Sequence, residues 1–208
     1  MSMRNPRLAL LFALPLLSVI LGPARLLAGV ALEQVRQTAD RIQSLVQDPR
    51  FKGAERQSER REKIRQVLAR RFDYAEMSKR SLGSYWQRGS AEEQQQFVKL
   101  FTDLLERSYA EQIESYDGEK IAYGRETVNG NQAEVDTKII TKKGEEISVN
   151  YKLQNTGGDW KVYDVVIENI SIVNNYRSQF NRVLANASFS ELLQRLQSKS
   201  VDVKPVRS

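Results

Sequence analysis

The stretch that decides the fold is Trp160 to Phe180, which reads WKVYDVVIENISIVNNYRSQF. It begins as a strand with apolar side chains on both faces and continues through a polar break into a helix. Because side chains alternate along a strand, one face is expected to carry Tyr163, Val165 and Ile167. The other face is expected to carry a second apolar set: Trp160, Val162 and Val166. Apolar groups should therefore pack against both faces of the strand. The groups on only one of the two faces have to belong to the protein itself.

Three alternating segments precede this strand, at 120–127, 132–139 and 146–153, with turns between them. Together with the Trp160 strand they predict an antiparallel meander of four strands, with a fifth strand as an alternative. One face of this sheet should be exposed to solvent and the other apolar. Helical periodicity dominates before residue 115 and returns after residue 170. The fold class expected is α+β, with helices on one face of the sheet and an apolar cavity enclosed between them.

Start and stop signals place the helices. Leu32 to Gln47 has apolar side chains at helical spacing and ends before Pro49. The capping box Ser90-Ala-Glu-Glu93 predicts the start of a long helix that runs to about Ser115. A second box at Ser188 to Glu191 predicts the last helix, and Gly83 a helix end.

The first 31 residues are typical of a secretory signal, with an apolar run of 14 residues from Leu8 to Leu21. Small residues then predict cleavage after Ala31, with Ala28 as the alternative, and an uncleaved membrane anchor is the competing interpretation. Residues 32–200 are expected to form a single domain, and 201–208 a disordered tail. Removal of residues 1–31 would leave 29 basic and 26 acidic residues, too weak a balance for a nucleic-acid binder. The basic run Arg56 to Arg71 is interpreted as a solvated helix face.

Missing residue types exclude much chemistry. The chain has no histidine and no cysteine, which removes the imidazole base, the thiol nucleophile and the usual zinc ligands. Neither a catalytic residue nor a metal site nor a cofactor is expected. Asp164, the one acid within an apolar strand, is either a structural hydrogen-bond acceptor or a functional acid. An enzyme built on paired carboxylates such as Asp164 and Glu168 stays open as a lesser alternative.

The residues then match a known family. The segments FDYAEMSKRSLGSYWQRGSAEEQQQFVKLFTDLLERSY (Phe72 to Tyr109) and WKVYDVVIENISIVNNYRSQF (Trp160 to Phe180) resemble the MlaC family of toluene-tolerance or ABC-transporter auxiliary proteins. The resemblance covers most of the mature chain. It departs from the family pattern in Lys52 to Lys63 and after Lys199.

The resemblance implies a periplasmic phospholipid carrier, with phospholipid as cargo. It also implies two partners: an inner-membrane ABC transporter with its ring protein, and an outer-membrane lipoprotein–porin complex. A monomer is expected. The faces assigned above, joined to the family picture, give the residues expected to line the lipid cavity: Phe72, Met77, Trp86, Phe101, Leu104, Val149, Tyr151, Tyr163, Val165 and Ile167.

Three cations are candidates for the head-group phosphate: Arg177, Arg80 and Lys79. The sequence does not distinguish a filled core from a core with a cavity, and an exported adaptor without a ligand is the alternative function. Four tyrosines at inward or junction positions favour a cavity, because a buried hydroxyl needs a partner. They are Tyr74, Tyr123, Tyr151 and Tyr163.

Overall fold

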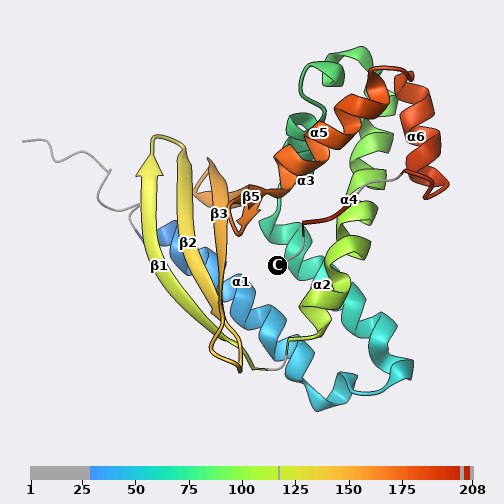
Figure 1. Cartoon of the computed structure of the whole chain (residues 1–208). Helices are drawn as coiled ribbons and strands as arrows, with labels where there is room; N and C mark the ends of the chain where they lie inside the picture. The colour runs from blue at the N-terminus through green and yellow to red at the C-terminus, as the bar shows by residue number, and fades with distance from the viewer. Residues whose placement is uncertain (1–28, 117, 202–203, 207–208) are drawn as a thin grey trace, which may run out of the picture.

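The computed structural model describes residues 29–116, 118–201 and 204–206 (Figure 1). The strands form one antiparallel sheet in the order β1-β2-β3-β4-β5. Their bounds are β1 Lys120–Asn129, β2 Gln132–Ile140, β3 Glu146–Thr156, β4 Asp159–Ile167 and β5 Ile170–Ser171. The α-helices are α1 Val30–Gln47, α2 Gln57–Arg71, α3 Tyr74–Leu82, α4 Ala91–Glu114, α5 Ile172–Leu184 and α6 Phe189–Gln197. Short 3₁₀ turns lie between α1 and α2 and between α3 and α4: η2 Pro49–Phe51, η3 Ala54–Arg56 and η4 Gly83–Arg88.

The helices cover one face of the sheet. In Figure 1, α1 runs diagonally beside the sheet, α5 leads away from β5, and α4 and α6 lie farther from the sheet. Helix α1 packs on β1, β2 and β4, whereas α2, α3 and α5 pack on β4. The opposite face carries exposed charges such as Glu134 and Lys138. The expected α+β architecture is confirmed, and β5 supplies the fifth strand.

Local signals position the long helix. Ser90 and Glu93 form the reciprocal capping box at the start of α4, as the sequence predicts. Gly83 ends α3 with a φ of 57°, and a Cβ atom there would lie 2.9 Å from the Arg177 guanidinium. The backbone conformation therefore requires glycine at this position, and a larger residue would also displace the Arg177 guanidinium.

The buried apolar residues form two separate clusters. The larger cluster joins the sheet to α3, α4, α5 and α6, and includes Trp160, Phe97 and Leu192. The smaller cluster lies where α1 and α2 meet, around Phe51 and Ile64. Burial of each large side chain stabilises the fold by about 1.5–3 kcal/mol, so both clusters hold the layers together.

One half-buried cation links three elements. Arg71, at the end of α2, donates hydrogen bonds to Gln34 in α1, to Asp159 in β4 and to the Trp160 carbonyl. The geometry explains why the first and second helices stay attached to the fourth strand. A charged hydrogen bond of this kind contributes about 1.5–3 kcal/mol.

The basic run is not simply a solvated face, so that interpretation was incomplete. Arg61 bonds Glu114 at 2.6 Å, and Arg65 bonds Asp103 at 2.8 Å and Glu106 at 3.0 Å. These long side chains bridge α2 to α4. The arginines of the run thereby hold together helices whose backbones do not pack closely.

The ends of the chain bear on two expectations. Most of the expected signal, residues 1–28, lies outside the described residues, but Ala31 is fully buried in α1. At the other end, Val206 is only 6% exposed and belongs to the larger cluster. The disordered tail stays a prediction, whereas among the described residues side chains of α4 and α5 bind Lys204 to Val206.

Candidate functional site

The candidate site is the face of the sheet that looks toward the helices. Strand register places Tyr123 of β1, Val149 of β3 and Ile167 of β4 in one row across this face. The next row contains Val135, Tyr151 and Val165. Thr137 of β2 completes the first row and Glu126 of β1 ends the second, so the two rows form one mainly apolar surface across the sheet.

Much of this surface is only half-buried. Apolar side chains that pack on the larger cluster but stay partly exposed come from both layers. On the sheet they are Tyr123, Ile139, Ile147, Tyr151 and Ile167, and on the helical side Phe72, Tyr74, Leu104 and Tyr109. A close-packed core would bury such large groups completely. Their shared partial exposure marks where the two layers meet imperfectly.

Two tyrosine hydroxyls on the sheet side of this surface, those of Tyr123 and Tyr151, lack ordinary partners. The Tyr123 hydroxyl is buried and accepts or donates no hydrogen bond within the described residues. No hydrogen bond of the described part of the chain involves the Tyr151 hydroxyl either. Burial raises the pKa of both phenols to about 12, and Arg36 lies over the Tyr123 ring at 4.7 Å. An unpaired buried hydroxyl is costly, so the pair could serve as donors to ester or phosphate oxygen.

The ten residues expected to line a cavity divide into two groups. Five are half-buried in the structure: Phe72, Trp86, Leu104, Tyr151 and Ile167. The other five are buried, each less than 9% exposed: Met77, Phe101, Val149, Tyr163 and Val165. The surface that could accept a ligand is therefore narrower than the sequence indicates.

The expected faces of β4 are wrong, because the strand contains a β-bulge. Leu153 pairs with Val162 and Lys152 with Asp164, which leaves Tyr163 without a partner in β3. This extra residue puts Val162 and Val165 on the same inner face, three positions apart. Tyr163 instead packs under the Arg80 guanidinium, 4.0 Å from the ring centre.

Phe101 belongs to the helical layer and not to the sheet surface. Its ring packs against Phe97 of the same helix and against Tyr176 and Phe180 of α5, with centroids 5.2–5.6 Å apart. Edge-to-face and stacked rings of this kind stabilise the contact between helices. Trp86 lies in η4, where its carbonyl accepts a hydrogen bond from Gln94 of α4.

The three head-group candidates lie on α3 and α5, and two of them have other contacts. Arg80 pairs with Glu76 at 2.7 Å besides covering Tyr163. Arg177 packs over Gly83, which brings it close to the end of α3. Lys79 is exposed near the same helix end. Lys79 and Arg177 thus lie near the same end of α3, whereas Arg80 is already engaged with Glu76 and Tyr163.

Asp164 has a structural role in this geometry. Its carboxylate accepts hydrogen bonds from the Ser171 hydroxyl at 2.6 Å and from the Val173 N–H at 3.1 Å. Both donors belong to the start of α5. A carboxylate held at a helix N-terminus is the expected arrangement, and it fixes α5 to the sheet.

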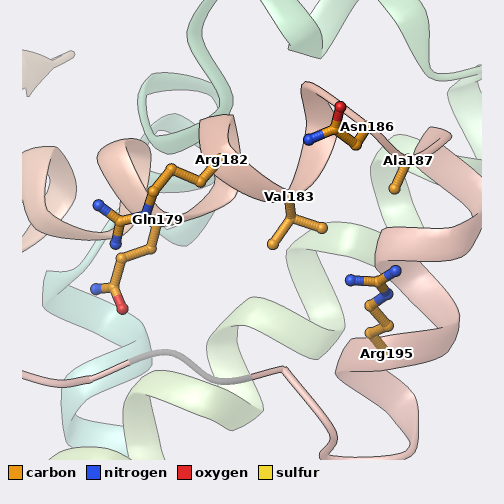
Figure 2. A pocket seen from close by; sticks show the side chains of 6 residues that line it. All are labelled: Gln179, Arg182, Val183, Asn186, Ala187 and Arg195. Carbon is orange, nitrogen blue, oxygen red and sulfur yellow. The ribbon is translucent and has the colours of Figure 1, made fainter.

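A pocket of about 260 Å³ lies elsewhere, between α5 and α6 (Figure 2). Its lining is largely polar: Gln179, Arg182, Val183, Asn186, Ala187 and Arg195. Ligand pockets usually measure about 300–1,000 Å³ and are mostly apolar. This pocket is therefore a poor match for the apolar cavity that the sequence indicates.

Sequence reasoning missed two residues of the surface. Tyr109 of α4 is half-buried, and burial raises the pKa of its phenol. Ile147, at the start of β3, has the alternation of an inward residue and could have been included on that signal. Within the described part of the chain, the acidic residues do not gather into a metal-binding group. None of the described helices is both long and apolar enough to cross a bilayer.

Together, the one-sided sheet and the partly exposed apolar surface under its helices define a class of α+β protein suited to an apolar ligand between layers. The comparisons give the family: the MlaC protein model matches residues 36–198, and this chain belongs to that family.

Three similar proteins illustrate the relationship. The intermembrane phospholipid transport system binding protein MlaC of Haemophilus influenzae is 26% identical over 171 residues, which are 80% of each chain. The toluene tolerance protein ttg2D of Pseudomonas putida is 30% identical over 97 residues, 46% of this chain and 45% of that protein. A solved structure of the phospholipid-binding protein from Ralstonia solanacearum, in complex with a phospholipid, superposes with a TM-score of 0.73. That match covers 81% of this chain and 96% of the other, at 24% identity.

Proposed function

We propose that this chain is a periplasmic carrier of phospholipid, whose acyl chains lie between the inner face of the sheet and the helices. The observation that carries the proposal is the half-buried surface around Tyr151, Ile167 and Leu104. Family membership supports it, as do relatives named for phospholipid transport and phospholipid binding. The cargo is the lipid itself, and the protein acts as a binder and not as an enzyme.

The buried valines set a condition on this function. Val149 and Val165 are each 7% exposed, so an acyl chain enters only if the helical layer moves away from the sheet. The contact between α2 and α4 allows such movement, because arginine side chains bridge it. The pairs of Arg65 are partly exposed and contribute little stability, whereas the Glu114 side chain is only 10% exposed, so separating its pair with Arg61 costs about 1.5 kcal/mol.

Energetics favour exchange with a membrane over release into water. Each methylene removed from water gains about 0.8 kcal/mol, so roughly thirty methylenes gain on the order of 24 kcal/mol. This value exceeds the practical limit of about 18–21 kcal/mol for binding. An acyl chain is removed from water both in the protein and in a bilayer, so the two transfer free energies nearly cancel. The same protein can therefore load and release its cargo.

Direction then has to come from partners. We propose that the carrier meets an outer-membrane lipoprotein–porin complex at one end of its path and the ring protein of an inner-membrane ABC transporter at the other. Export by the N-terminal signal would place it between them. The MlaC name of a relative in an intermembrane transport system supports this assignment.

Substitution of Leu104 by tryptophan tests the site. Leu104 is half-buried on α4, so a larger ring there should fill the ligand space while the protein stays folded. We expect uptake of phospholipid from liposomes to fall severalfold, with little change in melting temperature. Gln95→Trp, at an exposed position of the same helix, is the matched control.

The alternative function is an exported adaptor that binds no lipid. Its supporting observation is the burial of half the expected cavity residues. An adaptor would leave liposomes unloaded in every variant, and Leu104→Trp would then lower the melting temperature through overpacking alone.

A further inference from the structure

The C-terminal segment is bound to α5 by its backbone. We call Lys204 to Val206 the C-terminal anchor. The Gln179 side chain grips the Lys204 peptide unit twice: its oxygen accepts the Lys204 N–H at 2.7 Å, and its amide donates to the Lys204 carbonyl at 3.0 Å. Asn175 donates to the same carbonyl at 2.8 Å. Such contacts recognise an extended backbone, whatever its side chain, and the Lys204 side chain is itself exposed.

Val206 completes the anchor with an apolar contact. Its N–H donates to the Tyr109 hydroxyl on α4 at 3.1 Å, and its side chain is 6% exposed. The anchor is thus fixed to α5 by one residue and to α4 by the next but one. These two attachments place the anchor between the two helices.

The anchor lies beside the candidate lipid surface. Gln179 and Asn175 both donate to the Lys204 carbonyl, and the helix that carries them begins beside β5. Val206 belongs to the same cluster as the inner-face residues Val135, Val149 and Val165. In Figure 1 the described end of the C-terminal segment, drawn in dark red, lies beside α4 on the side that faces the sheet. Its partner Tyr109 is one of the half-buried side chains of that surface.

We infer that the chain's own C-terminal anchor, bound to Gln179 of α5 and Tyr109 of α4, competes with an acyl chain for the surface beside Tyr109. This inference rests on the proposed function. The anchor covers apolar surface when no acyl chain does, and loading displaces it. A few hydrogen bonds from side chains of the helices to the anchor's backbone, together with one buried valine, hold the anchor in place. Its displacement therefore requires no unfolding of the helices.

Two variants test the competition in delipidated full-length protein. Val206→Asp places a charge where the valine is buried and should release the anchor. Gln179→Ala removes two hydrogen bonds to Lys204 without touching Val206. We expect both variants to take up phosphatidylglycerol–phosphatidylethanolamine from liposomes severalfold faster than the native chain. Gln197→Ala, at an exposed position at the end of α6, is the control and should take up lipid at the native rate.

Amide hydrogen exchange gives a second measurement. The Val206 amide should be protected from exchange in delipidated protein and exchange severalfold faster after lipid is loaded. An anchor with only a structural role would keep the same protection in both forms. Native-rate uptake by both variants, or unchanged Val206 protection on loading, would overturn the inference alone. Failure of the native protein to take up any lipid would instead overturn the proposed function.

Discussion

Glu126 of β1 caps the helix that begins almost one hundred residues earlier. Its two carboxylate oxygens accept hydrogen bonds from the Gly29 N–H at 2.7 Å and from the Leu32 N–H at 2.6 Å. Gly29 itself offers no side chain to cap α1. A β-bulge between Tyr123 and Glu126 turns the carboxylate toward the inner face, where α1 lies.

Glu126→Gln should therefore destabilise the protein by about 1 kcal/mol, because a neutral amide is a weaker acceptor at a helix N-terminus. Urea unfolding at neutral pH measures the change. Glu111→Gln, at an exposed position of α4, should stay within about 0.5 kcal/mol of the native protein. Equal effects of the two substitutions would show that the cap contributes nothing.

The same contact bears on processing of the N-terminus. Cleavage after Ala31 would remove a fully buried residue and the Gly29 contact, whereas cleavage after Ala28 would retain both. We therefore expect the exported protein to begin at Gly29, with its ammonium group beside Glu126. The intact mass of protein from the periplasm distinguishes residues 29–208 from 32–208, and the shorter mass would contradict this prediction.

Acid should weaken the link between α2 and α4. The Arg61 hydrogen bond, opposed by desolvation and assisted by Gln57, lowers the pKa of Glu114 below its ordinary 4.5. An acid whose pKa is lowered by folding stabilises the folded protein at pH values above its ordinary pKa. This stabilisation is lost as the pH falls through the lower pKa of the folded state. Glu114→Gln should cost about 1.5 kcal/mol at pH 7. Unfolding of both proteins near pH 3 should show a smaller difference, and a constant difference would argue against the ion pair.

Tyr123→Phe tests whether the unpaired hydroxyl is held ready for a ligand. In delipidated protein the substitution removes a buried group without a partner, so stability should rise by up to about 1 kcal/mol. Retention of phospholipid should fall, because the donor to lipid oxygen is gone. Tyr176→Phe is the matched control, since its hydroxyl already bonds Ser108 and its loss should not stabilise. If the Tyr123→Phe protein is less stable than the native protein and binds lipid normally, the Tyr123 hydroxyl does not belong to the ligand site.

Local patterns predict most of the fold. Alternation identifies β1 to β4, and Ser90 identifies the start of α4, because these signals lie within a few neighbouring residues. Phe189, Leu192, Leu193 and Leu196 are buried as helical spacing indicates. The pattern of apolar residues is therefore sufficient for the class of architecture.

The faces near the bulges could not be predicted in the same way. A bulge adds one residue to a strand and reverses the alternation beyond it, as it does at Tyr163 and again before Glu126. Whether a strand accommodates the extra residue depends on its partner across the sheet. The contacts of Arg71 with α1 and of Val206 with Tyr109 likewise join segments that are distant in sequence, and no local pattern indicates them.

The central claim is that phospholipid enters between the β-layer and its helices, and mass spectrometry of an organic extract of the purified native protein tests it most directly. The account predicts phospholipid at near one molecule per chain from the native protein and markedly less from Leu104→Trp. Native protein free of lipid, which also stays empty after incubation with liposomes, would contradict it.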